Sequence, residues 1–130
     1  MCLLDEVVDW NEDRIHCRSR GHLNPAHVLR HDGRLAAVHL IEFGAQAMAI
    51  HGGLLSARQK ERARPGFIAS VRRADFECES LQDIDAPLDI QAQRVAGSEA
   101  GWTYDYQATA DGAALGSGRV SVMFIPEPAP

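Results

Sequence analysis

The residues best placed to do chemistry lie on one apolar stretch, Leu35 to Gly53, whose sequence LAAVHLIEFGAQAMAIHGG predicts a single long helix. At about 100° per residue, the side chains of His39, Glu42 and Gln46 fall within roughly 60° of one another. A helix that is apolar nearly all round is typical of the interior of a fold. A buried carboxylate costs free energy unless it is paired, protonated or used in catalysis. Glu42 is therefore the first candidate for a catalytic group, with proton transfer as its chemistry.

Four of the other five histidines are candidates beside Glu42 and His39. His22, His27 and His31 fall in the segment Gly21 to Gly33, which contains Asn-Pro and Asp-Gly steps and reads as an irregular loop. His27 and His31 have a metal-ligand spacing for a helix, but the loop character and the lack of a third ligand argue against a metal. His51 lies about 180° from Glu42 on the helix, so we expect it to cap the C-terminal end.

The main basic cluster is the run Ala57 to Arg64, ARQKERAR, in a protein whose net charge is −5. Its cations would attract an anionic partner or a phosphate group. A solvated surface loop accounts for the same residues equally simply. The cations are Arg58, Lys60, Arg62 and Arg64, with Arg72 and Arg73 nearby in the sequence.

The composition limits the classes of function. The chain has 130 residues, 45% of them hydrophobic and 24% charged, which is ordinary for a soluble domain with its own core. Its acidic balance is unlike that of a nucleic-acid-binding protein. Cys2, Cys17 and Cys78 lack a metal-binding or disulfide pattern, so we expect free thiols. No signal peptide or membrane span is recognisable, and we expect a cytoplasmic protein.

The elements that must hold these residues are a hairpin, the helix and a run of strands. Met1 to Trp10 and Arg14 to Arg20 are predicted to form the hairpin, and the helix is expected to end at Gly52-Gly53. Asp111-Gly112 has the sequence of a tight hairpin turn between the last two strands. The four later strands are predicted at Gly66 to Phe76, Leu88 to Val95, Trp102 to Ala110 and Ala113 to Ile125.

This order predicts an α+β fold in which one long buried helix is wrapped by a curved antiparallel sheet of about five to six strands. The alternation in Leu88 and Ile90, and in Trp102, Tyr104 and Tyr106, gives the sheet one apolar face. Residues 1–125 are expected to form a single domain, and residues 126–130 a short proline-rich tail.

The helix motif LIEFGAQAMA (Leu40 to Ala49), together with PGFIASVRRADF (Pro65 to Phe76), resembles the hotdog superfamily. The similarity is to its β-hydroxyacyl carrier-protein dehydratase branch and covers nearly the whole chain. The loop HLNPAHVLRHDGRLAA lacks the Gly-His-Phe-Pro-Gly-His-Pro type segment that carries that branch's catalytic histidine, and Ala36-Ala37 stands where Pro-Gly is usual. The Asn-Pro and Asp-Gly-Arg variant resembles divergent dehydratases found with aryl-polyene or pigment biosynthesis.

The resemblance implies removal of water from a 3-hydroxyacyl thioester in fatty-acid or polyene-type synthesis. His27, fifteen residues before Glu42, would be the base and Glu42 the acid, with His22 and His31 as rivals for the histidine. Gln46 would orient the substrate. The backbone N–H groups of Ala37, Val38 and His39 would stabilise the thioester oxygen, because they lie at a helix N-terminus. His39 is otherwise expected to be a packed supporting or interface residue.

The resemblance also implies the partners. The substrate would be carried on a phosphopantetheine thioester of an acyl carrier protein or coenzyme A, at the basic cluster described above, and no other cofactor or metal is implied. Because such sites form between two subunits, we expect a homodimer or larger assembly. Two alternatives stay open: an acyl thioesterase that uses Glu42 to activate water, and a non-catalytic hotdog subunit that pairs with an active homologue.

Overall fold

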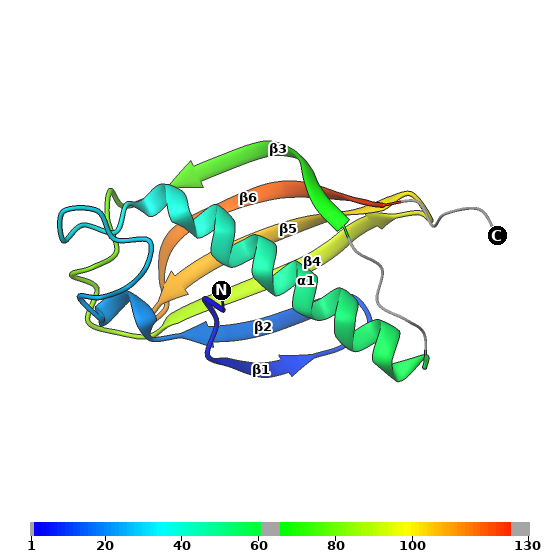
Figure 1. Ribbon diagram of the computed structural model, residues 1–130, viewed down its shortest axis with the longest axis horizontal. Coiled ribbons are helices and arrows are strands. Elements are labelled where there is room, and N and C mark those ends of the chain that lie inside the picture. Colours follow the sequence, from blue (N-terminus) through cyan, green and yellow to red (C-terminus); the bar gives the residue numbers. More distant parts are fainter. Residues whose placement is uncertain (1, 61–65, 126–130) are drawn as a thin grey trace.

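The structure, a computed structural model, describes residues 2–60 and 66–125. One helix lies across one curved sheet (Figure 1). The helix α1 (Leu40–Arg58) follows two short 3-10 turns, Gly21–Leu23 and Ala37–His39. The strands are β1 (Glu6–Trp10), β2 (Arg14–Ser19), β3 (Gly66–Phe76), β4 (Leu88–Gly97), β5 (Gly101–Ala110) and β6 (Ala113–Phe124).

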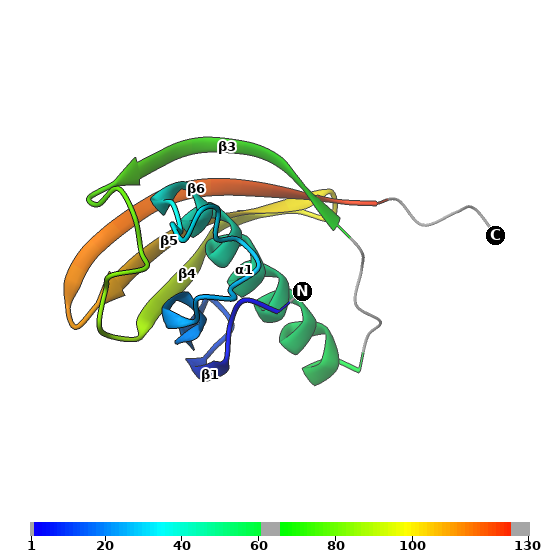
Figure 2. The ribbon, with the colours of Figure 1, turned by 60° about the vertical axis from the view of Figure 1, so that its left-hand side comes forward.

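The sheet has six strands in the order β1-β2-β4-β5-β6-β3, and every neighbouring pair is antiparallel. Figure 2 shows that the sheet curves around α1, so that the helix lies on its concave side. β1 and β3 are the two edge strands. The predicted arrangement of one buried helix and a wrapped antiparallel sheet is confirmed.

The core lies between α1 and the concave face of the sheet. Phe43 and Ala47 of α1 are fully buried, as are Leu88 and Ile90 of β4. At Gly44 the helix backbone approaches the sheet so closely that an added Cβ would lie 2.7 Å from Cγ of Tyr106. A glycine is therefore required there for close contact between helix and sheet.

Two boundaries of the helix differ from the prediction. The segment from Leu35 begins as an extended stretch and a 3-10 turn, and α1 itself starts only at Leu40. The helix does not end at Gly52-Gly53, because Leu55 in the next turn is also buried in the core. It ends instead where Lys60 adopts a left-handed backbone with φ of 59°.

The strands agree closely with the sequence pattern, and β3 has the predicted bounds. The turn Asp111-Gly112 has φ of 53° and 81°, the left-handed values that a tight hairpin requires. β1 starts at Glu6 rather than Met1, and Leu3 and Leu4 before it are buried in the core. All three cysteines are free, as expected.

Candidate active site

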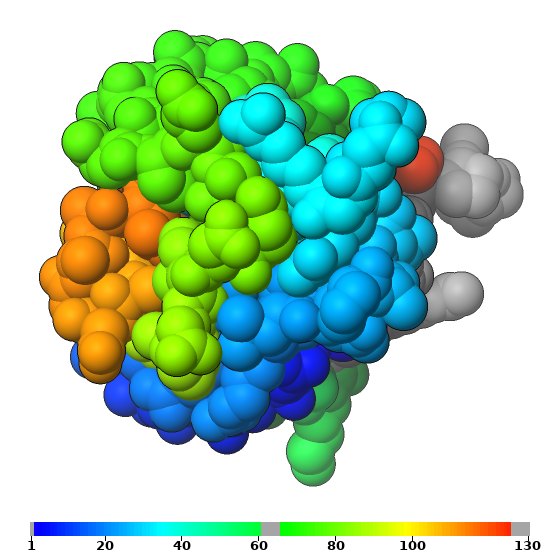
Figure 3. All heavy atoms as spheres, turned by 90° about the vertical axis from the view of Figure 1, so that its left-hand side faces the viewer, coloured from blue at the N-terminus to red at the C-terminus, as the bar shows by residue number. Residues whose placement is uncertain are grey.

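Two loops close the fold over the N-terminal end of α1. Figure 3 shows the segment between β2 and α1 lying beside the segment between β3 and β4 at this end of the molecule. Backbone hydrogen bonds join them: the N–H of Ala37 donates to the carbonyl of Glu79 at 2.9 Å, and that of Leu81 donates to Leu35 at 2.8 Å. This frame fixes the start of α1 and the histidine-bearing loop.

Glu42 lies in the first turn of α1, with its carboxylate 2.7 Å from Nδ1 of His39. The expectation that Glu42 is buried is wrong for the single chain, because 51% of its side chain is exposed. The inner face of this turn is occupied by Leu40 and Phe43, so Glu42 points away from the core. The His39–Glu42 pair is thus an accessible acid–base pair.

His27 is half-buried in the loop before α1, with its ring stacked on that of Phe43 at 6.3 Å between centroids and 20° between planes. The N–H of Leu29 donates to its Nδ1 at 3.1 Å. The pKa of His27 lies below the ordinary value, first because burial disfavours the cation and then because Arg30 lies nearby. His27 is therefore neutral at pH 7, with its proton on Nε2.

Within one chain, the described residues place no direct hydrogen bond between His27 and Glu42. His27 is engaged by Leu29, and Glu42 by His39. Both residues are at the same end of α1, and Phe43, the neighbour of Glu42, supports the ring of His27. The two candidate catalytic groups therefore lie at the same end of the fold, without a hydrogen bond between them in the single chain.

The other histidines separate clearly by environment. His22 is fully buried and bonds through Nε2 to the carbonyl of Ile84 at 2.8 Å, a structural position. His31 is almost fully exposed beside Asp32. His51 does not cap the helix as expected, because α1 continues past it. It is buried, with Nδ1 2.5 Å from the Tyr104 hydroxyl and Nε2 2.7 Å from the carbonyl of Asn11.

The residues predicted to bind substrate have partners of their own. The N–H groups of Ala37 and His39 donate to the carbonyls of Glu79 and Ala36, at 2.9 and 3.2 Å. The N–H of Val38 has no acceptor among the described residues, and it is the one of the three that remains available. Oε1 of Gln46 accepts the N–H of Leu3 at 2.7 Å, so this side chain holds the N-terminal segment.

The predicted basic cluster is described only in part. The guanidinium of Arg58 lies over the ring of Trp10, 5.1 Å from its centroid, and bonds to Glu12 at 3.2 Å. Lys60 is exposed just past the helix end. Arg62 and Arg64 lie outside the described residues. No group of three or more metal-ligating side chains occurs within residues 2–60 and 66–125, and no helix there is long and apolar enough to cross a membrane.

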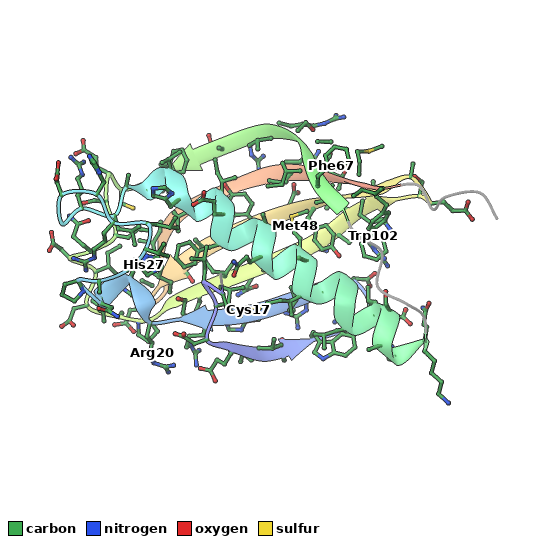
Figure 4. The ribbon with its side chains drawn as sticks, in the orientation of Figure 1. Cys17, Arg20, His27, Met48, Phe67 and Trp102 are labelled. Carbon is green, nitrogen blue, oxygen red and sulfur yellow. The ribbon has the colours of Figure 1, made fainter. Side chains whose placement is uncertain are left out.

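A cavity of about 570 Å³ extends along the C-terminal half of α1. On the helix its walls include Ala45, Ala49 and Gly52, and on the sheet they include Phe67 and Trp102. Figure 4 shows Phe67 and Trp102 far from His27, which lies at the opposite end of the helix. In the sequence, this cavity corresponds to a series of small residues on the side of the helix that carries Glu42.

Comparison with known proteins agrees with this architecture. The model of a family described as ApeP-like, ApeP dehydratase, matches residues 1–129. Among solved structures, the dehydratase heterocomplex ApeI:P of Xenorhabdus doucetiae superposes with a TM-score of 0.86 at 22% identity, over 97% of this chain and 84% of that one.

A hypothetical thioesterase of Streptococcus pneumoniae with coenzyme A superposes with a TM-score of 0.69 at 11% identity, over 95% of this chain and 88% of that one. A mutant of the phenylacetic acid degradation protein PaaI of Thermus thermophilus gives 0.64 at 18% identity, over 92% of both chains. At these identities the solved structures establish the hotdog fold alone. A comparison with curated proteins gave no match.

Proposed function

Since the chain belongs to the ApeP-like dehydratase family, we propose that it removes water from a 3-hydroxyacyl thioester. The acyl group would be carried on the phosphopantetheine arm of an acyl carrier protein or of coenzyme A. The reaction needs a base for the proton on C2 and an acid for the hydroxyl group that leaves from C3.

The observation that supports this proposal best is the position of Glu42 relative to the cavity. Residues 42, 45, 49 and 53 recur at helical spacing and so share one face of α1. Glu42 is the first residue of this face, and the small residues that follow it on the same face line the cavity. A thioester held at Glu42 can therefore extend its acyl chain along the helix into an apolar space.

The proton transfers require both candidate groups. A carboxyl at Glu42, hydrogen-bonded to His39, can donate the proton to the leaving hydroxyl. His27 is kept neutral by burial, as a base must be, but the N–H of Leu29 occupies its unprotonated Nδ1. His27 can accept the C2 proton only after it releases Leu29. The free N–H of Val38 supports the predicted stabilisation of the thioester oxygen.

A second subunit would complete the site. β3 hydrogen-bonds to β6 on one side only, and its outer edge is unpaired among the described strands. Phe67, Ile68 and Val71 on this strand are 43–54% exposed, which is unusual for an apolar edge. Pairing at β3 with a copy or a homologue would cover these side chains. It would also bring the partner's loop toward Glu42.

The described part of the basic cluster does not lie beside the candidate site. Arg58 and Lys60 lie at the C-terminal end of α1 and would attract a phosphate or an acidic carrier protein, but Glu42 is in the first turn, at the opposite end of the helix. Arg58 already donates a hydrogen bond to Glu12, which weakens its attraction for a phosphate or an acidic carrier. With the thioester at Glu42 and the acyl chain directed toward the C-terminal half of α1, the carrier would approach at the N-terminal end, so the basic cluster is not its main proposed contact.

One observation favours a second candidate function. Because the N–H of Leu29 donates to Nδ1 of His27, the other ring nitrogen, Nε2, carries the proton and is a donor rather than an acceptor. A chain with this arrangement could contribute Glu42 while a homologous subunit supplies the active histidine. In that case the chain is a partner subunit of a dehydratase and has no activity by itself.

The test is a mass-spectrometric assay with 3-hydroxyacyl carrier protein, comparing the wild type with Glu42→Gln and His27→Ala. We expect loss of one water from the substrate with the wild type and with neither variant. Glu79→Gln and His31→Ala are matched controls, because both side chains are more than nine-tenths exposed at the same end of the fold and should leave activity unchanged.

Each other outcome has a distinct meaning. Release of free acid would replace the dehydratase by the thioesterase. No turnover by the pure protein, with activity restored by a co-expressed homologue, would establish the partner subunit. Full activity in Glu42→Gln would overturn the proposed site.

A further inference from the structure

The histidine loop, residues 21–33 between β2 and α1, is closed by a single side chain. The guanidinium of Arg30 donates from Nη2 to the carbonyl of His22 at 2.7 Å and from Nη1 to the carbonyl of Gly33 at 3.2 Å. We infer that Arg30 is a positioning residue for His27: it closes this loop and so fixes the imidazole in one place and one tautomer. Because it concerns the role of His27, the inference rests on the proposed function.

The two carbonyls are ones that only an arginine side chain can reach together. They belong to residues near the start and the end of the loop, which no helix or strand pairing in the described chain joins. A guanidinium presents its donors in a fixed planar fork, whereas a lysine ammonium is a single point of charge. Hydrogen bonds from a charged donor are also about twice as strong as neutral ones. Arg30 therefore sets how tightly the loop is closed.

The backbone beside Arg30 connects this closure to His27. The N–H of Arg30 donates to the carbonyl of His27 at 3.0 Å, and the N–H of Leu29 donates to Nδ1 of the ring at 3.1 Å. The N–H of His27 itself donates to the carbonyl of Asn24 at 2.9 Å. His27 is thus held by its backbone and by its ring, in a turn whose last residue is Arg30. The release of Leu29 that base catalysis requires is an opening of this turn.

The imidazole of His27 has little space in which to move. Phe43 of α1 stacks against one face of the ring. A Cβ at Gly21 would lie 3.3 Å from Cδ2 and 3.6 Å from Nε2, so the ring edge lies against the start of the loop. Leu29, which bonds to the ring, packs against the hydrophobic core. A change in the closure of the loop would therefore shift the ring or alter its bond at Nδ1.

Arg30 is also buried enough for its charge to act on the ring. Its Nε is buried and has no acceptor among the described residues. Burying part of a cation in this way costs free energy. The same burial brings the charge within electrostatic range of His27.

The groups around His27 come from three elements. Burial is the first cause of its lowered pKa, followed by Arg30 and His22 of the loop and His39 of the 3-10 turn. α1 presents the uncharged ring of Phe43. Of these groups, Arg30 is the one that stays charged at any pH near neutrality. Removal of its charge should therefore raise the pKa of His27.

Three variants separate the charge of Arg30 from its hydrogen bonds. Arg30→Met removes the charge and both bonds but keeps an unbranched side chain. Arg30→Lys keeps the charge and cannot span both carbonyls. Arg34→Met is the matched control, because Arg34 lies just beyond the loop, is 57% exposed and pairs with Glu79 at 3.7 Å.

Hydrogen exchange measured by NMR reports the closure of the loop without turnover. The N–H groups of His27 and Leu29 should exchange about ten- to a hundredfold faster in Arg30→Met and Arg30→Lys, the effect of losing a hydrogen bond from a charged donor. The N–H of Leu81, which bonds outside the loop, should not change and shows that the fold persists. Arg34→Met should match the wild type at all three. If Arg30→Met does not fold, Arg30→Lys still tests the closure.

Titration of the imidazole by NMR reports the effect of the charge. The resonance of His27, assigned by its absence in His27→Gln, should titrate at higher pH in Arg30→Met and at the wild-type pH in Arg30→Lys. In an active preparation, the acid limb of kcat/KM should move to higher pH in Arg30→Met, because the base must be neutral. A side chain that only stabilised the fold would move neither the pKa nor the limb.

The outcomes separate this inference from the proposed function. Unchanged exchange of Leu29, or an unchanged pKa of His27, in Arg30→Met would overturn it. Equal changes in Arg34→Met would overturn it too, as would faster exchange at Leu81, because the cause would then be general charge or general stability. A raised pKa of His27 with an unmoved acid limb, or in a protein that dehydrates no substrate, would leave the inference standing and count against the proposed chemistry.

Discussion

His51 of α1 and Tyr104 of β5 share a buried hydrogen bond of 2.5 Å between Nδ1 and the phenolic hydroxyl. The other ring nitrogen of His51 donates to the carbonyl of Asn11, so Nδ1 must accept the proton of the tyrosine. Burial lowers the pKa of His51 and raises that of Tyr104. The bond therefore joins two neutral groups and ties the helix to both the sheet and the first hairpin.

The neutral state of His51 predicts a dependence of stability on pH. The pKa of His51 is 6.5 when unperturbed and lower in the folded protein, so below pH 6.5 the unfolded chain binds more protons. The stability that the neutral His51 contributes is fully present above pH 6.5. It is lost as the pH falls toward the lowered pKa, by up to about 1.4 kcal/mol per pH unit. Urea denaturation between about pH 8 and pH 5 measures this slope.

His51→Gln should flatten the slope, since the amide can donate to Asn11 but does not titrate in this range. His27 also has a lowered pKa and contributes in the same direction, so His27→Gln is the necessary comparison. If His51→Gln kept the full wild-type slope, the buried pair could not be its source.

Two glycines of the same helix predict opposite effects of one substitution. Alanine is favoured over glycine in a helix interior by about 1 kcal/mol. Gly53→Ala should be stabilising by up to that amount, because nothing lies within 4 Å of the new Cβ. Gly44→Ala should be destabilising by about 1–3 kcal/mol, since its Cβ would fall 2.7 Å from the Tyr106 ring. The midpoints of urea unfolding give both values, and a stabilised Gly44→Ala would contradict the close packing of α1 on β5.

The position of Gln46 predicts a loss of stability rather than of substrate affinity. Its Oε1 is the acceptor for the N–H of Leu3, a residue that is 5% exposed. Gln46→Met keeps the length of the side chain and removes the acceptor, which should cost about 1–3 kcal/mol. Unfolding midpoints and the KM for the acyl thioester are measured together. A raised KM at unchanged stability would instead support the predicted role in substrate orientation.

Much of the fold was predictable because periodicity and turn chemistry are local signals. β3 and the turn at Asp111 are specified by their own residues. The end of α1 was not, because Gly52 and Gly53 remain helical under the packing of Leu55, a tertiary effect. The burial of His51 escaped prediction for the same reason: its partner Tyr104 is 53 residues away.

The candidate site was less predictable than the fold. Helical spacing brings His39 and Glu42 together, and the structure has their side chains in contact at 2.7 Å. The exposure of Glu42 depends on which face of α1 packs against the sheet, and Leu40 and Phe43 occupy that face. The cavity required knowledge of which strand faces Ala49 and Gly52, although the small residues themselves were visible in the sequence.

The two edges of the sheet predict different responses to an added charge. Val71 on β3 is 43% exposed and Val7 on β1 is 38% exposed, so the two sites are closely matched. A lysine on an edge strand opposes pairing with another chain, because its charge would have to be desolvated. If subunits pair through β3, Val71→Lys should reduce the assembly to single chains while Val7→Lys leaves its mass unchanged.

Native mass spectrometry and light scattering read out the assembly, and circular dichroism confirms that both variants fold. Activity should follow assembly, since His27 and Glu42 do not meet within one chain. If only Val7→Lys dissociated the assembly, the subunits would pair through β1 and not through β3. A fully active single chain would show that the site needs no partner, and would require His27 to reach Glu42 by movement of its own loop.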